Sequence, residues 1–118
     1  HIRYLPRIFH VNWFRKGQDG DFLWPGFGEN MRVLEWIIER CRGRVAGHET
    51  QIGWIPHWED FNTEGLHGFS RQQFNLVMKI DPEEWRHEFL SQGELYLKLH
   101  DHLPKELVFQ RELLACRL

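Results

Sequence analysis

The sequence predicts an α+β fold in which a short β-hairpin or sheet edge is followed by an amphipathic helix and by C-terminal helices. Three observations lead to this prediction. An aromatic stretch over 7–24 is divided by a glycine turn at 17–20, apolar residues between 31 and 41 recur at helical spacing, and a helix start signal stands at 81–84. Because 118 residues fit one compact domain, we treat residues 1–118 as a single domain.

The hairpin is predicted from the residues on either side of the glycine turn. Residues 7–14 (RIFHVNWF) are typical of one strand, and residues 21–24 of the returning strand. Pro-Gly-Phe-Gly at 25–28 then breaks regular pairing, because proline has no N–H to donate and glycine favours turns. We therefore expect this glycine-rich loop to lead onto the N-terminus of the first helix.

The first helix is predicted by apolar residues at positions i, i+3, i+4 and i+7, namely Leu34, Ile37, Ile38 and Cys41. These residues are expected to form its buried face. Asn30 suits the N-cap, where its side chain would accept a backbone hydrogen bond, and Gly43 suits the C-terminal stop. The following residues 44–51 are expected to form a loop, and residues 52–56 a short extended segment that proline closes.

The second half of the chain is predicted to be mainly helical. Residues 57–68 give few indications, and residues 69–80 favour a short helix. Asp81 provides an N-cap acceptor, Pro82 fits the first helical position and Glu84 the third, so a helix is expected to follow, with Gly93 weakening its middle. Pro104 is expected to open the last helix, whose apolar stripe is formed by Leu107, Leu114 and Leu118.

The composition is typical of a soluble globular protein. The chain is 42% hydrophobic and 27% charged, and its net charge of −2 gives no general reason to expect binding to nucleic acid or to a membrane. We expect a cytoplasmic protein, with a mitochondrial location left open. The basic residues near the start are Arg3, Arg7, Arg15 and Lys16, and they suit either a solvated strand edge, which we favour, or a nearby phosphate.

The sequence contains no recognisable catalytic or metal-binding motif. Cys41 and Cys116 belong to no zinc-ligand spacing, and we expect both to be packing residues in a reducing compartment. His100 and His102 form the tightest histidine cluster, yet no H-E-x-x-H pattern accompanies them. We therefore assign no catalytic residue and no metal ligand to this chain.

Several unusual segments nevertheless carry a specific resemblance. FHVNWFRKG at 9–17, DFLWPGFGEN at 21–30 and RVLEWI at 32–37 resemble the C-terminal nucleotide-binding part of the GTP-dependent phosphoenolpyruvate carboxykinases. The resemblance continues more weakly through IGWIP, PEEW and LPKEL, and so spans nearly the whole chain. It implies that residues 1–118 are a fragment of a larger α/β enzyme.

The resemblance also implies a function. The family is a group of decarboxylating lyases of gluconeogenesis that convert oxaloacetate and GTP to phosphoenolpyruvate, GDP and carbon dioxide. They use manganese or magnesium, whose ligands precede the segment that is matched here, as do the phosphate-binding loop and the substrate-binding arginines. The chain alone is therefore expected to be inactive, with guanine nucleotide and the remainder of the parent enzyme as its partners.

The resemblance further implies which residues bind the nucleotide. Phe14 and Phe27 would flank the guanine ring, Phe22 would add an aromatic contact, and the Asn30 carboxamide would read the base edge together with backbone groups near Trp13 and Phe14. For Asn30, simple helix capping is the alternative that we consider less favoured. Trp24 and Pro25 are expected to shape the pocket rather than touch the ligand. The expected set is Trp13, Phe14, Phe22, Phe27, Gly28, Glu29 and Asn30.

Two other classes of function stay open at this point. The chain could act alone as a noncatalytic guanine-nucleotide-binding or scaffold domain, which catalytic residues in a longer parent protein would exclude. Alternatively, its aromatic residues and basic start could form a platform for single-stranded nucleic acid. The acidic remainder of the chain argues against that alternative, because such platforms need an extended basic surface.

Overall fold

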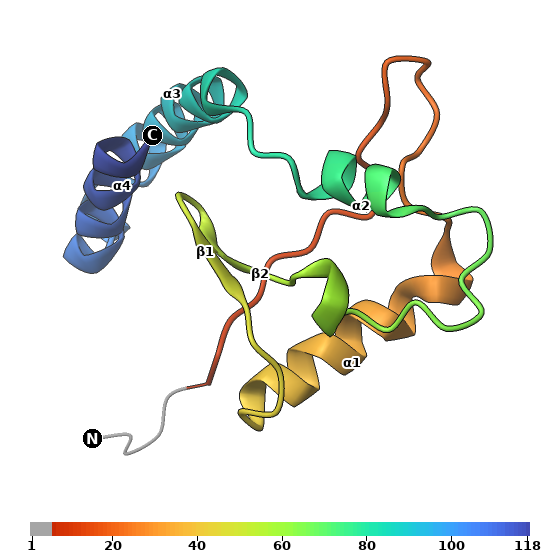
Figure 1. Cartoon of the computed structure of the whole chain (residues 1–118). Helices are drawn as coiled ribbons and strands as arrows, with labels where there is room; N and C mark the ends of the chain where they lie inside the picture. The colour runs from red at the N-terminus through yellow and green to blue at the C-terminus, as the bar shows by residue number, and fades with distance from the viewer. Residues whose placement is uncertain (1–5) are drawn as a thin grey trace. The chain divides into compact units, whose positions relative to one another are not determined.

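The computed structural model describes residues 6–118 and shows a small α+β protein with a two-stranded sheet and four α-helices in that range. The described residues form two compact units. The first unit extends to His48 and continues with Trp54–Lys79, and the second contains Glu49–Gly53 and Ile80–Leu118. Figure 1 labels the helices and strands, which are α1 (Asn30–Cys41), β1 (His48–Thr50), β2 (Gly53–Ile55), α2 (Arg71–Met78), α3 (Pro82–Leu99) and α4 (Lys105–Arg117).

The core of the first unit consists almost entirely of aromatic rings. Its most buried side chains are Trp24, Trp36, Phe61, Leu66, Phe69 and Phe74. Most of the ring pairs meet edge to face; the rings of Trp24 and Phe69, for example, are 5.4 Å apart between centroids at 75°. Each such pair adds roughly 0.5–1.5 kcal/mol beyond the burial of its area. Phe61 and Leu66 come from residues 57–68, which gave few indications in the sequence, and Phe69 and Phe74 from residues 69–80, where a short helix was predicted.

Helix α1 has the predicted length but buries a different face. It ends where expected, with Gly43 in the left-handed region at φ 72°. Its buried residue is Trp36, and Val33 and Ile37 pack beside it, whereas Leu34 is 40% and Ile38 46% exposed. The prediction that Leu34, Ile38 and Cys41 lie on the buried face is therefore wrong. The large indole of Trp36 removes more apolar area from water and so sets the orientation of the helix.

The predicted hairpin at 7–24 is reduced to its turn. Gly17 N–H donates to the Asp21 carbonyl at 2.9 Å, and one antiparallel bridge pairs Lys16 with Phe22. Residues 7–14 form no strand, so that part of the prediction is wrong. Pairing beside the turn stops after this single bridge.

The two-stranded sheet lies after the first helix instead. β1 occupies residues that were expected to form a loop, so that expectation is wrong, while β2 lies inside the predicted extended segment. Only two residues join the strands, which makes the pair antiparallel. On β2, the indole of Trp54 lies 5.0 Å below the guanidinium of Arg40, which belongs to α1.

Helix α2 confirms the short helix that was expected within 69–80. It begins with a complete capping box, in which Gln73 N–H donates to Ser70 Oγ at 3.3 Å and Ser70 N–H donates to Gln73 Oε1 at 2.7 Å. Both bonds satisfy backbone donors that a helix start otherwise leaves unpaired. Phe74, one turn further on, is 3% exposed and anchors the helix in the core.

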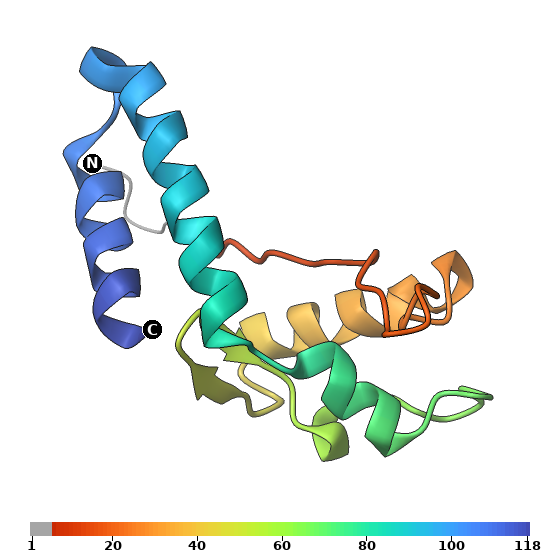
Figure 2. The same cartoon turned by 90° about the horizontal axis from the view of Figure 1, so that it is seen from above.

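The second unit is dominated by a helical hairpin. Asp81 accepts hydrogen bonds from the N–H groups of Glu83 and Glu84, and Pro82 is the first residue of α3, as predicted. After the turn at 100–104, Pro104 precedes α4, also as predicted, and Figure 2 shows the two helices running side by side in opposite directions. Leu114 and Leu118 of the predicted stripe are half-buried, and Leu107 is 44% exposed.

Some expectations about individual residues are also decided. Cys41 and Cys116 are both exposed, so the prediction that they are packing residues is wrong. Within residues 6–118, no three His, Cys, Asp or Glu side chains are placed to hold a metal ion together. No helix in this range combines the length and apolar character that crossing a membrane requires.

Candidate functional site

A pocket of about 440 Å³ lies in the first unit at the expected position. Its lining residues are Trp13, Phe14, Phe22, Trp24, Gly26, Phe27 and Asn30. This volume is in the range of small-molecule sites, which are mostly apolar with a few polar groups that fix orientation. Five residues of the expected set are thus brought together.

The two remaining residues of the expected set do not line the pocket. The Glu29 carboxylate forms an ion pair with the Arg32 guanidinium at 2.5 Å, on the same helical turn. Gly28 lies in the short 3₁₀ helix Phe27–Glu29, between the loop and α1. Trp24 and Gly26 take their places in the pocket wall, and the density of aromatic residues and glycines in 22–28 is the sequence signal for both.

The aromatic walls of the pocket present free ring surface. Phe14 and Phe22 meet edge to face at 5.9 Å and 62°, yet they stay 70% and 57% exposed, and Phe27 is 91% exposed. Leaving three large rings in water is unfavourable unless another molecule covers them. The Lys16 ammonium lies 5.5 Å from the Phe22 centroid and places a positive charge near the rim.

Asn30 holds the polar position in this pocket, and its orientation is fixed from within the protein. Trp24 Nε1–H donates to Asn30 Oδ1 at 2.8 Å. An indole N–H can only donate, so its partner must be the carboxamide oxygen, and Nδ2 takes the other end of the amide. Among the described residues, nothing accepts a hydrogen bond from Nδ2, which leaves a donor available at the pocket.

Asn30 does not cap the helix. It is the first helical residue, Glu29 precedes it at the N-cap without a side-chain bond, and the Asn30 backbone N–H donates to the Phe27 carbonyl. The expectation that Asn30 is the N-cap is wrong, because its side-chain oxygen bonds to the indole rather than to a backbone N–H. Helix capping, the alternative role considered for the Asn30 side chain, is therefore excluded.

The backbone around the pocket is shaped by one glycine and one asparagine. Gly26 adopts φ 125° and ψ −176°, a conformation that only glycine visits without strain. Phe14 N–H donates to Asn12 Oδ1 at 3.0 Å, so this backbone donor is already used. A ligand edge that approaches Trp13 and Phe14 would therefore meet carbonyl acceptors rather than that N–H group.

The basic start of the chain has a structural role where it is described. Arg7 donates to the Arg40 carbonyl at 3.1 Å, near the end of α1. Arg15 donates to the carbonyls of Val77 at 2.9 Å and of Lys79, at the end of α2. Cations favour such positions because helix C-termini carry partial negative charge. These two arginines thus satisfy helix ends rather than a strand edge, and Arg3 lies outside the described residues.

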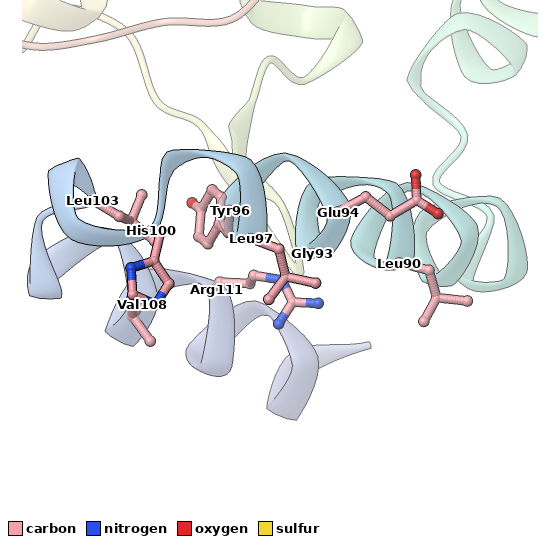
Figure 3. A pocket seen from close by; sticks show the side chains of 9 residues that line it. All are labelled: Leu90, Gly93, Glu94, Tyr96, Leu97, His100, Leu103, Val108 and Arg111. Carbon is pink, nitrogen blue, oxygen red and sulfur yellow. The ribbon is translucent and has the colours of Figure 1, made fainter.

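A larger pocket of about 670 Å³ lies in the second unit, between α3 and α4. Figure 3 shows its lining residues, which are Leu90, Gly93, Glu94, Tyr96, Leu97, His100, Leu103, Val108 and Arg111. Its principal cation is already engaged, since the Arg111 guanidinium stacks 3.6 Å from the Phe89 centroid and donates to the Phe89 carbonyl at 2.9 Å. None of the expected site residues lies there, and we place the candidate site in the first unit.

The pocket combines exposed aromatic walls with one oriented amide, a lining whose chemistry suits a flat molecule with a polar edge. The chain matches the family model described as the phosphoenolpyruvate carboxykinase C-terminal P-loop domain over residues 1–117. The chain therefore belongs to this family, and the resemblance of the aromatic segments is confirmed. The sequence itself contains no G-x-x-x-x-G-K-S/T loop.

Similar proteins come from several bacterial groups. A phosphoenolpyruvate carboxykinase (GTP) from an Anaeromyxobacter species is 45% identical over 113 residues, which cover 96% of this chain and 19% of the relative. The corresponding protein of Treponema pallidum is 44% identical over 115 residues, covering 97% and 18%. That of Corynebacterium jeikeium is 44% identical over 104 residues, covering 87% and 17%. The chain spans about a fifth of the length of these relatives.

Proposed function

We propose that this chain is the guanine-nucleotide-binding part of an enzyme that converts oxaloacetate and GTP to phosphoenolpyruvate, GDP and carbon dioxide. The observation that carries the proposal is the convergence of Trp13, Phe14, Phe22, Phe27 and Asn30 on one open pocket. The names of the relatives, phosphoenolpyruvate carboxykinase (GTP), indicate the nucleotide and the reaction.

The chemistry of the pocket suits a purine base. Exposed phenyl rings cover the faces of a flat base, and each such stacking contact is worth roughly 1–3 kcal/mol. Guanine presents an acceptor at O6 and donors at N1 and N2, whereas adenine presents a donor at N6 and an acceptor at N1. The Asn30 Nδ2 donor and the carbonyls near Trp13 and Phe14 complement the guanine edge.

The chain's own residues are proposed to bind and orient the base and to contribute no step of the reaction. Phosphoryl transfer depends on positioning and on charge neutralisation by metal ions and cations. The metal, manganese or magnesium, would supply that neutralisation, and its ligands are proposed to lie in the remainder of the enzyme. Within residues 6–118, no cluster of side chains fits a metal ion.

A fluorescence titration tests the proposal. Trp13 and Trp24 line the pocket, so GDP is expected to quench tryptophan emission of the full chain, and ADP is expected to leave it unchanged at the same concentration. Phe14→Ala should weaken GDP binding by about tenfold, the equivalent of 1.4 kcal/mol for one stacked face. Equal quenching by GDP and ADP would remove the base-reading claim.

The matched control is Phe109→Ala in α4. Phe109 is 66% exposed, close to the 70% of Phe14, and lies outside the pocket. Both substitutions remove one exposed phenyl ring from the protein surface. If both variants lose GDP affinity by the same factor, the aromatic wall does not bind the base.

A further inference from the structure

We propose that Trp24 sets the nucleotide selectivity of this site by locking the polarity of the Asn30 carboxamide. The inference rests on the proposed function and names a positioning residue for it. The observation that carries it is the hydrogen bond from Trp24 Nε1–H to Asn30 Oδ1 at 2.8 Å.

A carboxamide has two ends of similar shape and opposite hydrogen-bonding character. A freely rotating Asn30 could turn Nδ2 toward the O6 acceptor of guanine or Oδ1 toward the N6 donor of adenine with equal ease. A freely rotating asparagine therefore does not discriminate between the two bases. Selectivity requires that one orientation be held before the base arrives, since preorganisation lowers the cost of binding the matching partner.

Trp24 is well placed to hold that orientation. It is 6% exposed and packs edge to face on Phe61 at 6.1 Å and on Phe69 at 5.4 Å. These rings fix the indole, so that its N–H end reaches the pocket while the rest of the ring belongs to the core. Turning the amide over would bring Nδ2 against the indole N–H, donor against donor, and would leave a half-buried N–H group without a partner.

The backbone of Asn30 is held as well. Its N–H donates to the Phe27 carbonyl, and the residue is the first of α1. Side chain and backbone are thus anchored at two points, on a helix rather than on a loop. Nδ2 is thus a hydrogen-bond donor in a fixed position. It can donate to the 6-oxo group of guanine, whereas the 6-amino group of adenine would place a second donor against it.

The test uses a pair of matched tryptophan variants. Trp36 is 5% exposed and its Nε1–H donates to the Ala46 carbonyl at 3.3 Å, away from the pocket. Trp24→Phe and Trp36→Phe therefore remove the same atoms from equally buried positions. Equilibrium dialysis of the full chain against labelled GDP and ADP gives the ratio of the two dissociation constants for each variant.

If this hydrogen bond holds the Asn30 carboxamide in one orientation (the Trp24–Asn30 lock), Trp24→Phe should lower the preference for GDP over ADP by about tenfold, mainly by tightening ADP binding. Trp36→Phe is expected to leave the preference unchanged. An unchanged preference in Trp24→Phe, or an equal loss of both nucleotides, would overturn the lock while leaving the proposed function standing. No preference in the parent chain would remove the proposed function itself.

A second measurement keeps the proposal testable if Trp24→Phe is poorly folded. The indole N–H of Trp24 in the parent chain should exchange with solvent slowly in NMR spectra. Asn30→Ala should accelerate that exchange by at least tenfold, while the indole N–H of Trp36 keeps its rate. Equal exchange of the Trp24 N–H in the parent and in Asn30→Ala would show that the hydrogen bond is absent in solution and would overturn the lock.

Discussion

Replacing Gly93 with alanine should destabilise the α3–α4 hairpin, against the usual rule for helices. In an ordinary exposed helix interior, alanine is more favourable than glycine by about 1 kcal/mol. At position 93, however, an added Cβ would lie 2.8 Å from Arg111 Nη2 and 3.5 Å from its Cζ. Figure 3 shows the Arg111 side chain reaching from α4 toward Gly93, so the guanidinium has to move.

The cost of moving Arg111 follows from its contacts. The guanidinium stacks 3.6 Å from the Phe89 centroid, donates to the Phe89 carbonyl at 2.9 Å, and belongs to a side chain that is 18% exposed. The stacking is worth about 0.5 kcal/mol or more, and a hydrogen bond to a charged group about 1.5–3 kcal/mol. Even the lower values sum to about 2 kcal/mol, so the net destabilisation should be about 1–2 kcal/mol.

Native-state hydrogen exchange of the full chain measures this effect where it occurs. Protected amides of α3 and α4 in Gly93→Ala should exchange about 5–30 times faster, because 1.4 kcal/mol corresponds to a factor of ten. The control is the Arg111→Leu background, in which Gly93→Ala should instead slow exchange, since only the helix propensity remains. If Gly93→Ala instead slows exchange in the parent background, the expected destabilisation is wrong, because Arg111 then moves aside without a loss of stability.

Three further changes are expected to have defined effects. Gly26→Ala should cost about 1–3 kcal/mol in chemical denaturation, because φ 125° strains any L side chain, and a cost below 0.5 kcal/mol would contradict that strain. Ser70→Ala should cost about 1 kcal/mol through loss of the capping box, seen as faster exchange confined to the start of α2. The hydrogen bond from Arg42 holds the pKa of Glu39 below its usual value; burial opposes this effect, and the charge and hydrogen bond of Arg44 add to it. The stability that the ionised Glu39 carboxylate gains from these arginines is present at neutral pH and is lost as the pH falls through about 4.5 and below. Glu39→Gln should therefore make thermal stability depend less on pH in the acid range. An unchanged pH dependence would count against the pairing.

The elements that sequence reasoning predicted correctly are those with strong local chemistry. Asp81 and Pro82 start α3 because a carboxylate acceptor and a residue without N–H both suit a helix start, whatever surrounds them. Gly43 ends α1 for the same kind of reason. The aromatic pocket was recognisable because the segment that builds it is short, contiguous and unusual in composition, so its residues meet without any knowledge of the tertiary fold.

The features that were missed depend on contacts between distant residues. Phe61 and Phe69 follow no helical or strand period, and they reach the core from irregular backbone. The buried face of α1 is set by Trp36, whose ring meets that of Phe9 and whose indole N–H donates to the Ala46 carbonyl, both outside the helix. Periodicity describes a single element, and it cannot weigh one large side chain against several smaller ones.

Trp24 belongs to the core and also lines the pocket, so a molecule bound in the pocket contacts a residue on which the fold depends. A molecule that binds only the folded state shifts the unfolding equilibrium by mass action, by about 2.7 kcal/mol at one hundred times its dissociation constant. If guanine nucleotide fills this pocket as proposed, it should protect the first unit as a whole against heat and proteases, well beyond the residues it touches. In a cell, the supply of guanine nucleotide would then help to set how long this part of the protein survives.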